Sequence, residues 1–519
     1  MVRLALLVLL SFAASFAADF DILIRNARVI DGSGNPWFLA DVGVKDGRIA
    51  AIGRLDHPSA ERTIDAARRV LAPGFIDVHT HIEGDVEKLP RGDNYVLDGV
   101  TTVVTGNCGG SEVKLGEWFS KLDQLGLGLN VASLIGHNSV RRDVMGTANR
   151  AATPEEIIKM QVLVEQGMND GAVGLSTGLI YIPGTYSNTE EVVALGKAAA
   201  RHGGVYASHM RDEGSKVMDA ITEAVTVGRE AGMSVELSHF KIDNRRLWGS
   251  SDKTITLVEK FRREGVDVVV DQYPYDHSST NLGITLPSWA LADGKVVERL
   301  SDEATRAKIA REMKDRLRSL GQKDYTYAIV ASYKPDAAYE GKSVAAITAA
   351  RGKGRKVDAQ IATIFDMMRQ GGAQMIYHSM GDKDVERILR YSNTAIASDG
   401  GIREFGTGMP HPRSYGTNAR VLAEFVRQRN VITLEDAIRR MTSLPARTFA
   451  FTDRGLVRVG MAADLVVFDP DKVQDKATYQ QPHQYTEGFD FVLVNGKLEV
   501  EGGKMTDARG GRVLRHTAR

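Results

Sequence analysis

Apolar, β-branched runs alternate with helical stretches through the middle of the chain, and this rhythm limits the fold more than any other feature. Each run suits a short strand buried on both faces, as in a parallel sheet or barrel whose connections are helices. The candidate strands span residues 74–79, 101–107, 130–137, 172–177, 204–209, 234–239, 266–273, 374–378 and 394–399. We therefore predict the α/β class and a (β/α)8 barrel. Such a barrel has eight places for nine candidates, and we expect 374–378 to lie outside it.

Two further regions flank or interrupt this rhythm. Short β-rich runs punctuated by glycine fill residues 20–52 and return at 463–468 and 492–497, which predicts a small β-sandwich domain formed by both termini. Residues from about 281 to 372 are charged and helical, so we predict an inserted subdomain that caps the site. The resulting division of the chain is 1–18 (signal peptide), 19–72 (first part of the sandwich), 73–450 (barrel with its insertion) and 451–519 (second part of the sandwich and tail).

The first residues have the pattern of a signal peptide. A positive charge at Arg3 precedes an apolar stretch from Leu4 to Phe16 and the small residues Ala17 and Ala18. This stretch is shorter than the roughly 20 residues needed to span a bilayer. We therefore expect cleavage after Ala17 or Ala18, export to the periplasm or the medium, and no stable membrane span after signal removal. An uncleaved N-terminal anchor is the lesser alternative.

The charge balance and the cysteine count narrow the classes of partner and site. Lys and Arg number 66, as do Asp and Glu, so no basic excess favours nucleic acid, and a small-molecule substrate is the expected partner. No motif indicates an oligomeric state. The single cysteine, Cys108, cannot form a disulfide within the chain. In an exported protein such a thiol is either a small buried side chain or a thiolate held by a metal.

Polar side chains fall at the carboxyl ends of the candidate strands, where TIM-like barrels build their active sites. One apolar run ends in His79-Thr80-His81, and its two imidazoles point the same way because strand side chains alternate between faces. Later strands end in Cys108, His209, His239 and Asp399. Each could be structural, as Asp399 would be in an Asp-Gly turn. Six such residues at one rim favour a zinc site, because zinc takes nitrogen, sulfur and oxygen ligands.

Several short motifs accompany these residues. They are Gly99-Val100-Thr101-Thr102, Asn107-Cys108-Gly109, a block from Gly174 to Gly184, Ser208-His209-Met210-Arg211, Leu237-Ser238-His239-Phe240-Lys241, Tyr273-Pro274-Tyr275, Ser398-Asp399-Gly400 and His411-Pro412-Arg413. Together they resemble the amidohydrolase superfamily and, within it, the D-aminoacylase (N-acyl-D-amino-acid deacylase) family. The resemblance covers nearly the whole chain after residue 18. The candidate strand 172–177 lacks the lysine that bridges two metals in many superfamily members.

The resemblance implies a ligand set and a mechanism. Cys108, His209 and His239 would hold a tighter zinc ion, and His79 with His81 would line a second, weaker metal position. Asp399 matches a general base that takes a proton from water activated by the metal and gives it to the departing nitrogen. The residues that match those gripping the substrate's α-carboxylate are Tyr181, Lys241 and Arg413. His137 resembles a family histidine at the third strand end and is expected to line the site.

We therefore predict zinc-dependent removal of the acyl group from N-acyl-D-amino acids, with the D configuration resting on the resemblance alone. A dipeptidase is the alternative enzyme, because an acylated amino acid and a dipeptide present the same amide and carboxylate. The alternative from another class is a non-catalytic amidohydrolase-like protein that serves in binding or as a scaffold. The loop 276–281 departs from the family pattern near the expected place of the substrate side chain, so the side-chain preference stays open.

Overall fold

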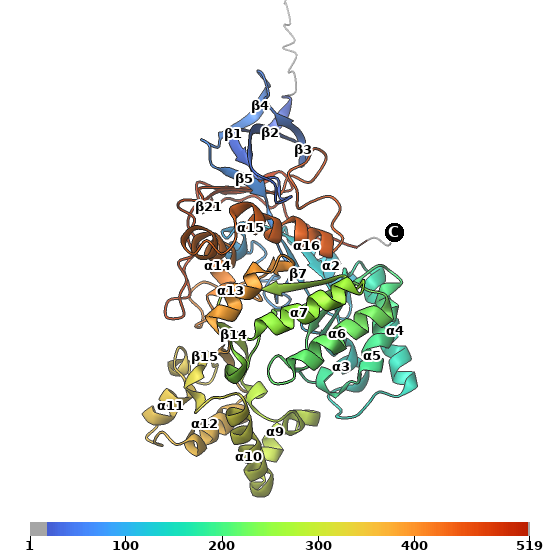
Figure 1. Cartoon of the computed structure of the whole chain (residues 1–519), viewed down its shortest axis with the longest axis vertical. Helices are drawn as coiled ribbons and strands as arrows, with labels where there is room; N and C mark the ends of the chain where they lie inside the picture. Colours follow the sequence, from blue (N-terminus) through green and yellow to red (C-terminus); the bar gives the residue numbers. More distant parts are fainter. Residues whose placement is uncertain (1–17, 517–519) are drawn as a thin grey trace, which may run out of the picture.

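The structure, a computed structural model, describes residues 18–516. Three regions follow one another along its longest axis: a β-rich domain, a middle region of strands and helices, and a mostly helical subdomain (Figure 1). The predicted signal peptide falls on residues 1–17, outside the described part, apart from Ala18. Among the helices of residues 18–516, none combines the length and the apolar character that a membrane span needs.

Parallel strands build the middle region. They are β6 (Phe75–Asp77), β7 (Val100–Thr105), β8 (Asn130–Ser133), β9 (Ile135–Gly136), β10 (Gly174–Gly178), β11 (Val205–His209), β12 (Val235–Leu237), β13 (Val268–Gln272) and β17 (Thr394–Ile396). They form two sheets, in the orders β6-β7-β8 and β17-β13-β12-β11-β10-β9. Only Leu134 separates β8 from β9, so one continuous stretch of chain links the two sheets.

The other edges of these sheets, β6 and β17, meet at their carboxyl ends. Thr80 and Gly400 form an isolated parallel bridge. The Asp399 N–H donates to the His79 carbonyl at 2.8 Å, and the His81 N–H donates to the Gly400 carbonyl at 2.8 Å. These main-chain bonds bring the first and last candidate strand ends, with their polar side chains, to the same place.

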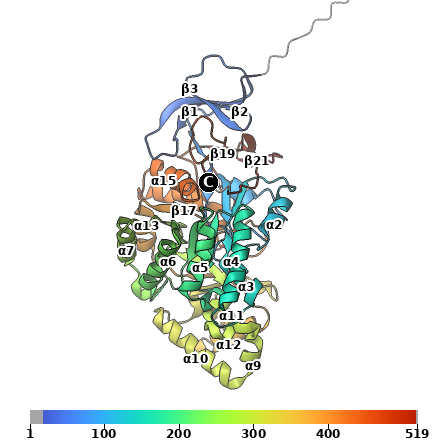
Figure 2. The same cartoon turned by 90° about the vertical axis from the view of Figure 1, so that its right-hand side faces the viewer.

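Helices cover the outside of these strands. They are α1 (Asp93–Val96), α2 (Leu115–Leu122), α3 (His137–Met145), α4 (Pro154–Asn169), α5 (Thr189–Ala200), α6 (Val217–Ala231), α7 (Ser251–Arg263), α13 (Asp382–Arg390), α14 (Arg413–Arg420), α15 (Leu434–Met441) and α16 (Ser443–Thr448). Figure 2 shows α4, α5 and α6 standing side by side over the strands. The apolar side chains between the two layers form the largest core of the protein.

The local sequence explains where such a helix begins. At the start of α4, the Thr153 hydroxyl accepts the Glu156 N–H, and the Glu156 carboxylate accepts the Thr153 N–H. Pro154 at the first helical position needs no hydrogen bond and has its φ already fixed. The helix then buries Met160, Val164 and Met168, which are spaced for one face.

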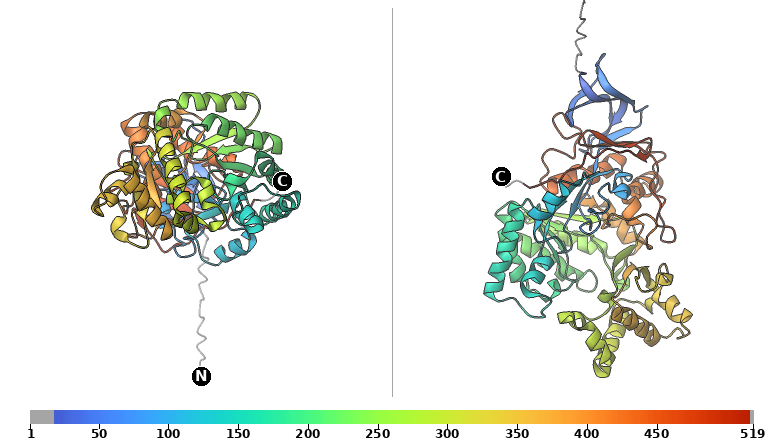
Figure 3. Two further views of the ribbon diagram at one scale, coloured as in Figure 1. Left: turned by 90° about the horizontal axis from the view of Figure 1, so that it is seen from below. Right: turned by 180° about the vertical axis from the view of Figure 1, so that it is seen from behind.

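An inserted subdomain covers one end of the middle region (Figure 3, left). Its antiparallel sheet consists of β14 (His277–Asn281), β16 (Gln374–His378) and β15 (Ala328–Ser332), in that order. Its helices include α8 (Ser288–Leu291), α9 (Val296–Ser301), α10 (Glu303–Ser319), α11 (Val344–Ala350) and α12 (Val357–Arg369), packed around a separate apolar core. Residues 374–378 thus lie outside the parallel sheets, as predicted. The predicted bounds of the insertion are too narrow, because β14 and β16 pair with each other and form its base.

The β-rich domain joins strands from both ends of the described chain in one nine-stranded sheet. The N-terminal strands are β1 (Phe20–Val29), β2 (Phe38–Lys45), β3 (Arg48–Gly53), β4 (Ala60–Asp65) and β5 (Val70–Pro73). The C-terminal strands are β18 (Leu465–Phe468), β19 (Phe489–Val494), β20 (Lys497–Glu501) and β21 (Lys504–Met505). Antiparallel pairing of β5 with β18 connects the two sets, and their side chains share one core.

Candidate active site

The strand ends bring a thiol and several imidazoles into contact. The Cys108 Sγ lies 3.3 Å from His79 Nε2 and 3.5 Å from both His209 Nδ1 and His239 Nε2. Zinc–sulfur and zinc–nitrogen bonds of ordinary length, arranged tetrahedrally, place ligand atoms about 3.5 Å apart. The donor set and its spacing therefore fit a zinc ion.

Three residues of the site have an unusual backbone conformation, which sets the direction of their side chains. Cys108, His239 and Asp399 have φ values of 53°, 37° and 50°, a region that residues other than glycine seldom occupy. Gly178 lets β10 approach the Cys108 loop, because a Cβ there would lie 2.1 Å from the Cys108 carbonyl oxygen. Unusual backbone of this kind costs energy and clusters at functional sites.

A second group of contacts surrounds Asp399. Its Oδ1 lies 3.2 Å from His81 Nε2 and 3.7 Å from His79 Nε2, and its Oδ2 lies 2.9 Å from Arg413 Nη1. The Arg413 guanidinium also stacks over the Tyr273 ring, with 4.6 Å to the ring centroid. Two sets of side chains here could each hold a metal ion: His79, His81 and Cys108, and His79, His239 and Asp399.

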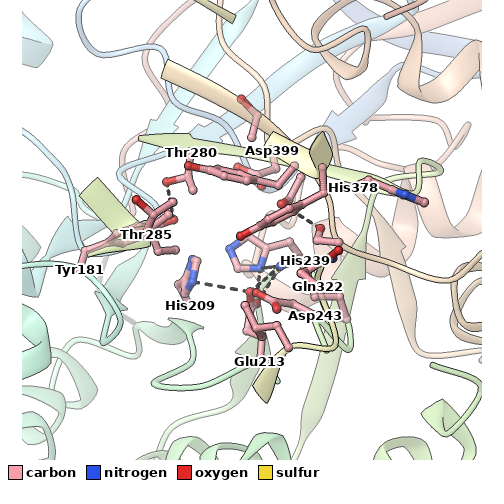
Figure 4. Close-up of a pocket in the computed structure, with 18 of the residues that line it drawn as sticks. Tyr181, His209, Glu213, His239, Asp243, Thr280, Thr285, Gln322, His378 and Asp399 are labelled. Carbon is pink, nitrogen blue, oxygen red and sulfur yellow. Dashed lines mark hydrogen bonds and ion pairs between the residues drawn. The ribbon is translucent and has the colours of Figure 1, made fainter. Parts of the chain in front are cut away.

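Glu213 connects Lys241 to the ligands. The Lys241 ammonium donates to both Glu213 oxygens, at 2.8 and 2.9 Å, and lies 2.7 Å from His239 Nδ1. Glu213 Oε1 is itself 2.9 Å from His239 Nδ1, and Figure 4 shows the carboxylate facing both His209 and His239. Lys241, predicted to grip a substrate carboxylate, is thus paired with a carboxylate of the protein and is only 4% exposed.

Asp271 on β13 supports the ligands from beneath. One of its oxygens accepts the Nδ1–H of His79 at 3.0 Å, and the other accepts the main-chain N–H of His239 at 2.8 Å. A carboxylate that binds the second nitrogen of a ligating histidine fixes the ring and its tautomer. Asp271 therefore orients two strand ends at once.

Electrostatics favour the ionised forms of the thiol and of the candidate base. Burial raises the pKa of the Cys108 thiol, but His79 and His209 lower it more, and the net pKa lies well below its usual range. Burial likewise raises the pKa of Asp399, whereas Arg413 and His81 lower it well below the ordinary value. At neutral pH the site therefore presents a thiolate and an ionised carboxylate.

A cavity of about 670 Å³, counted to its open mouth, lies between these residues and the insertion. Tyr181 lines it, with a hydroxyl oxygen that accepts the Thr280 hydroxyl at 3.1 Å. Ser278, Ser279 and Thr280 line it too, so the loop that departs from the family pattern contributes to the substrate cavity. His137 does not belong to this lining: it is fully buried, with Nε2 bonded to Glu191 at 2.8 Å.

Comparisons with known proteins identify the family of the chain. The amidohydrolase family model matches residues 62–499. The D-aminoacylase of Alcaligenes xylosoxydans xylosoxydans is 35% identical over 97% of this chain and 99% of that protein. The chain belongs to the amidohydrolase family. Its sequence resemblance to the D-aminoacylases is thereby confirmed.

Solved structures of this family match the fold. A D-aminoacylase studied for its binuclear metal centre has a TM-score of 0.82 at 34% identity, over 96% of this chain and 100% of that one. The N-acyl-D-glutamate deacylase of Bordetella bronchiseptica, in complex with zinc and a phosphonate mimic of the tetrahedral intermediate, also has a TM-score of 0.82, at 33% identity over 96% of this chain and 99% of that one.

Sequence reasoning missed two carboxylates of the amidohydrolase site, Glu213 and Asp271. Both had a signal. Asp271 directly follows the apolar run Val268-Val269-Val270 in a strand that reads as buried, and such a strand carries an acid only if it has a partner. Glu213 comes four residues after His209, a candidate ligand at a strand end, and is close enough along the chain to lie at the same end of the sheet.

Proposed function

We propose that this chain uses bound zinc to hydrolyse the amide of N-acyl-D-amino acids, releasing a carboxylic acid and the free D-amino acid. The observation that carries the proposal is the cluster of Cys108 with His209 and His239 at 3.5 Å, next to the ionised Asp399. The deacylase relatives support the reaction, and the zinc in one of them supports the metal.

The ligands divide between two metal positions. Cys108, His209 and His239 would hold the tighter zinc ion, while His79 and His81 would line a weaker second position. Zinc in such a site lowers the pKa of a bound water molecule to about 7 and polarises the acyl carbonyl. The binuclear centre of the related D-aminoacylase supports the second position. Glu213 and Asp271 keep the imidazoles of His239 and His79 in place.

The remaining side chains move the proton and hold the substrate. Asp399 accepts a proton from the attacking water and passes it to the departing nitrogen, as a general base and then acid. Arg413 and His81 keep its carboxylate ionised and pointed at the reacting centre. Tyr181, Lys241 and Arg413 bind the substrate's α-carboxylate. Lys241 then contacts both Glu213 and the substrate, and Arg413 contacts both Asp399 and the substrate.

The fold and the location of the protein complete the proposal. We infer that the parallel strands close into a (β/α)8 barrel, supported by the main-chain bonds between the ends of β6 and β17, and that the terminal strands form a β-sandwich beside it. We further propose cleavage after Ala17 or Ala18 and export to the periplasm or the medium. The mature N-terminus, read by mass spectrometry from a fractionated culture, tests the export.

Amine release by the purified, metal-quantified protein tests the function. The substrate panel comprises N-acetyl-D-amino acids, their L enantiomers, and dipeptides of both configurations. Turnover of the acyl-D compounds, lost with a chelator and restored by zinc, is the expected result. Cleavage of dipeptides alone would replace the proposal with the peptidase, and bound zinc with no turnover would favour the non-catalytic protein.

A further inference from the structure

Three positively charged side chains lie in or beside the catalytic cavity, and they differ in how they are paired. Lys241 is bonded to Glu213, and the Arg413 guanidinium beside the cavity contacts Asp399. Arg316 also lines the cavity, but no carboxylate of the described residues comes within 4.0 Å of its guanidinium. The charge of Arg316 is therefore available to a ligand.

Arg316 comes from the insertion, in the last turn of α10. It lines both the catalytic cavity and a neighbouring cleft, and the two share Tyr181, Glu213 and Asp243. Gln322, Tyr327 and Tyr377, all from the insertion, line the cavity with it. This wall thus has one guanidinium, one amide, two tyrosine rings, the imidazole of His378 and several hydroxyl groups, whereas the candidate metal ligands belong to the strands of the middle region.

A substrate of the proposed reaction presents three groups around its amide: the acyl chain, the α-carboxylate and the amino-acid side chain. Tyr181, Lys241 and Arg413 are assigned to the α-carboxylate. The remaining cation matches a second anion, and a guanidinium fork suits a carboxylate best. We propose that Arg316 determines specificity by binding a side-chain carboxylate, so that N-acyl derivatives of D-glutamate and D-aspartate are the preferred substrates. This inference rests on the proposed function.

Asp243 faces the same cavity and does not contradict this assignment. Its carboxyl forms no ion pair with Arg316, and Figure 4 shows it beside Glu213 and Gln322. Burial and the charge of Glu213 raise the pKa of Asp243. The charges of Arg316 and Lys241 lower it by less, so that the net pKa is about 7. A protonated Asp243 and the amide of Gln322 can each donate to the second oxygen of a bound carboxylate. The rings of Tyr327 and Tyr377 offer apolar surface to the methylene groups of the ligand.

The test compares Arg316→Gln with Arg318→Gln on the zinc-loaded full chain. Arg318 lies two residues further along α10, is exposed, pairs with Asp315 and does not line the cavity. We measure kcat/KM for the N-acetyl derivatives of D-glutamate, D-glutamine and D-leucine. Wild type should prefer D-glutamate to D-glutamine, and Arg316→Gln should lower kcat/KM for D-glutamate by roughly 10- to 100-fold, as for a lost hydrogen bond to a charged group. Values for D-leucine, and all values for Arg318→Gln, should stay within about twofold.

A binding measurement separates the two proposals. Free D-glutamate and D-glutamine are titrated into wild type and Arg316→Gln by calorimetry, which requires no turnover. Tighter binding of D-glutamate that depends on Arg316 would support the assignment even if no acylated compound were hydrolysed, which would overturn only the proposed function. Turnover of acyl-D compounds with the same D-glutamate to D-glutamine ratio in wild type and Arg316→Gln would overturn the assignment and leave the function intact. Thermal unfolding of both variants excludes misfolding, and Arg316→Lys should restore part of the preference.

Discussion

The two walls of the catalytic cavity are built differently. On the side of the parallel strands, His209, His239 and Asp399 are at most 9% exposed, and a carboxylate or guanidinium contacts each of them. On the side of the insertion, Arg316 is exposed and lacks a carboxylate partner among residues 18–516. Side chains that hold a metal or act on the reacting bond are kept in place by several contacts. A side chain that selects the substrate can be substituted without disturbing the others. Substitutions on the first wall should therefore lower activity strongly for every substrate, and substitutions on the second wall should lower it only for some substrates.

Cys108→Ser should have the largest effect, because it removes the thiolate that contacts three imidazoles. We expect zinc content to fall below one ion per chain, and activity to fall by more than the roughly 10²- to 10⁴-fold typical of a lost general base. Metal analysis and kcat/KM measure both effects. Retention of zinc together with activity would show that Cys108 is not a ligand.

Asp399→Asn should retain zinc and lose turnover. An amide cannot take the proton of the attacking water, so kcat should fall by roughly 10²- to 10⁴-fold while zinc stays near the wild-type content. Single-turnover kinetics on a metal-quantified sample provides the measurement. An Asp399→Asn protein with full kcat would contradict the role of this residue.

Glu213→Gln should weaken the first wall without abolishing it. The carboxylate touches His239 and Lys241, and losing such support for a ligand costs roughly 10- to 100-fold in metal affinity or activity. Competition with a zinc chelator gives the affinity. Asp219→Asn, an exposed carboxylate on α6, is the matched control and should behave as wild type.

Binding of an acidic substrate at Arg316 should respond to pH, because Asp243, from the segment after β12, faces the same cavity. Asp243, with a pKa raised to about 7, becomes negative as the pH rises through that value and then opposes a second negative charge beside Arg316. We expect KM for N-acetyl-D-glutamate to rise by about 2- to 5-fold between pH 6 and 8 relative to the D-leucine compound, the scale of a partly exposed charge pair. Asp243→Asn should flatten this difference. If the pH dependence of KM persisted in Asp243→Asn, another titrating group would be responsible for it.

His137→Gln should have the smallest effect on activity. The imidazole is bonded to Glu191, which also accepts from Arg141, and all three side chains are buried outside the cavity. Losing this bond should lower the free energy of unfolding by about 1–3 kcal/mol and leave kcat/KM unchanged within about twofold. Chemical denaturation and steady-state kinetics test the two parts. A loss of kcat without a loss of stability would show that His137 acts in the active site.

Local patterns explain why the sequence predicted the first wall well. The strands reveal themselves as apolar runs, and parallel strands joined by helices place all their carboxyl ends on one side. The residues that follow these runs must then converge, and this pattern indicates Cys108, His209, His239 and Asp399, which the structure brings together. The sequence predicts too narrow an insertion because residues 277–281, His277-Ser278-Ser279-Thr280-Asn281, have the composition of a polar loop, and only their pairing with β16 makes them a strand.

The sequence by itself determined the kind of chemistry, since ligand types and their position after buried strands are local properties of the chain. Only the tertiary structure decided which side chains pair. Glu213 reaches Lys241 across 28 residues, Glu191 rather than a substrate meets His137, and Arg316 enters the cavity from a subdomain with a core of its own. Such partners are distant along the chain, and packing alone brings them within hydrogen-bonding distance, so no local pattern records them.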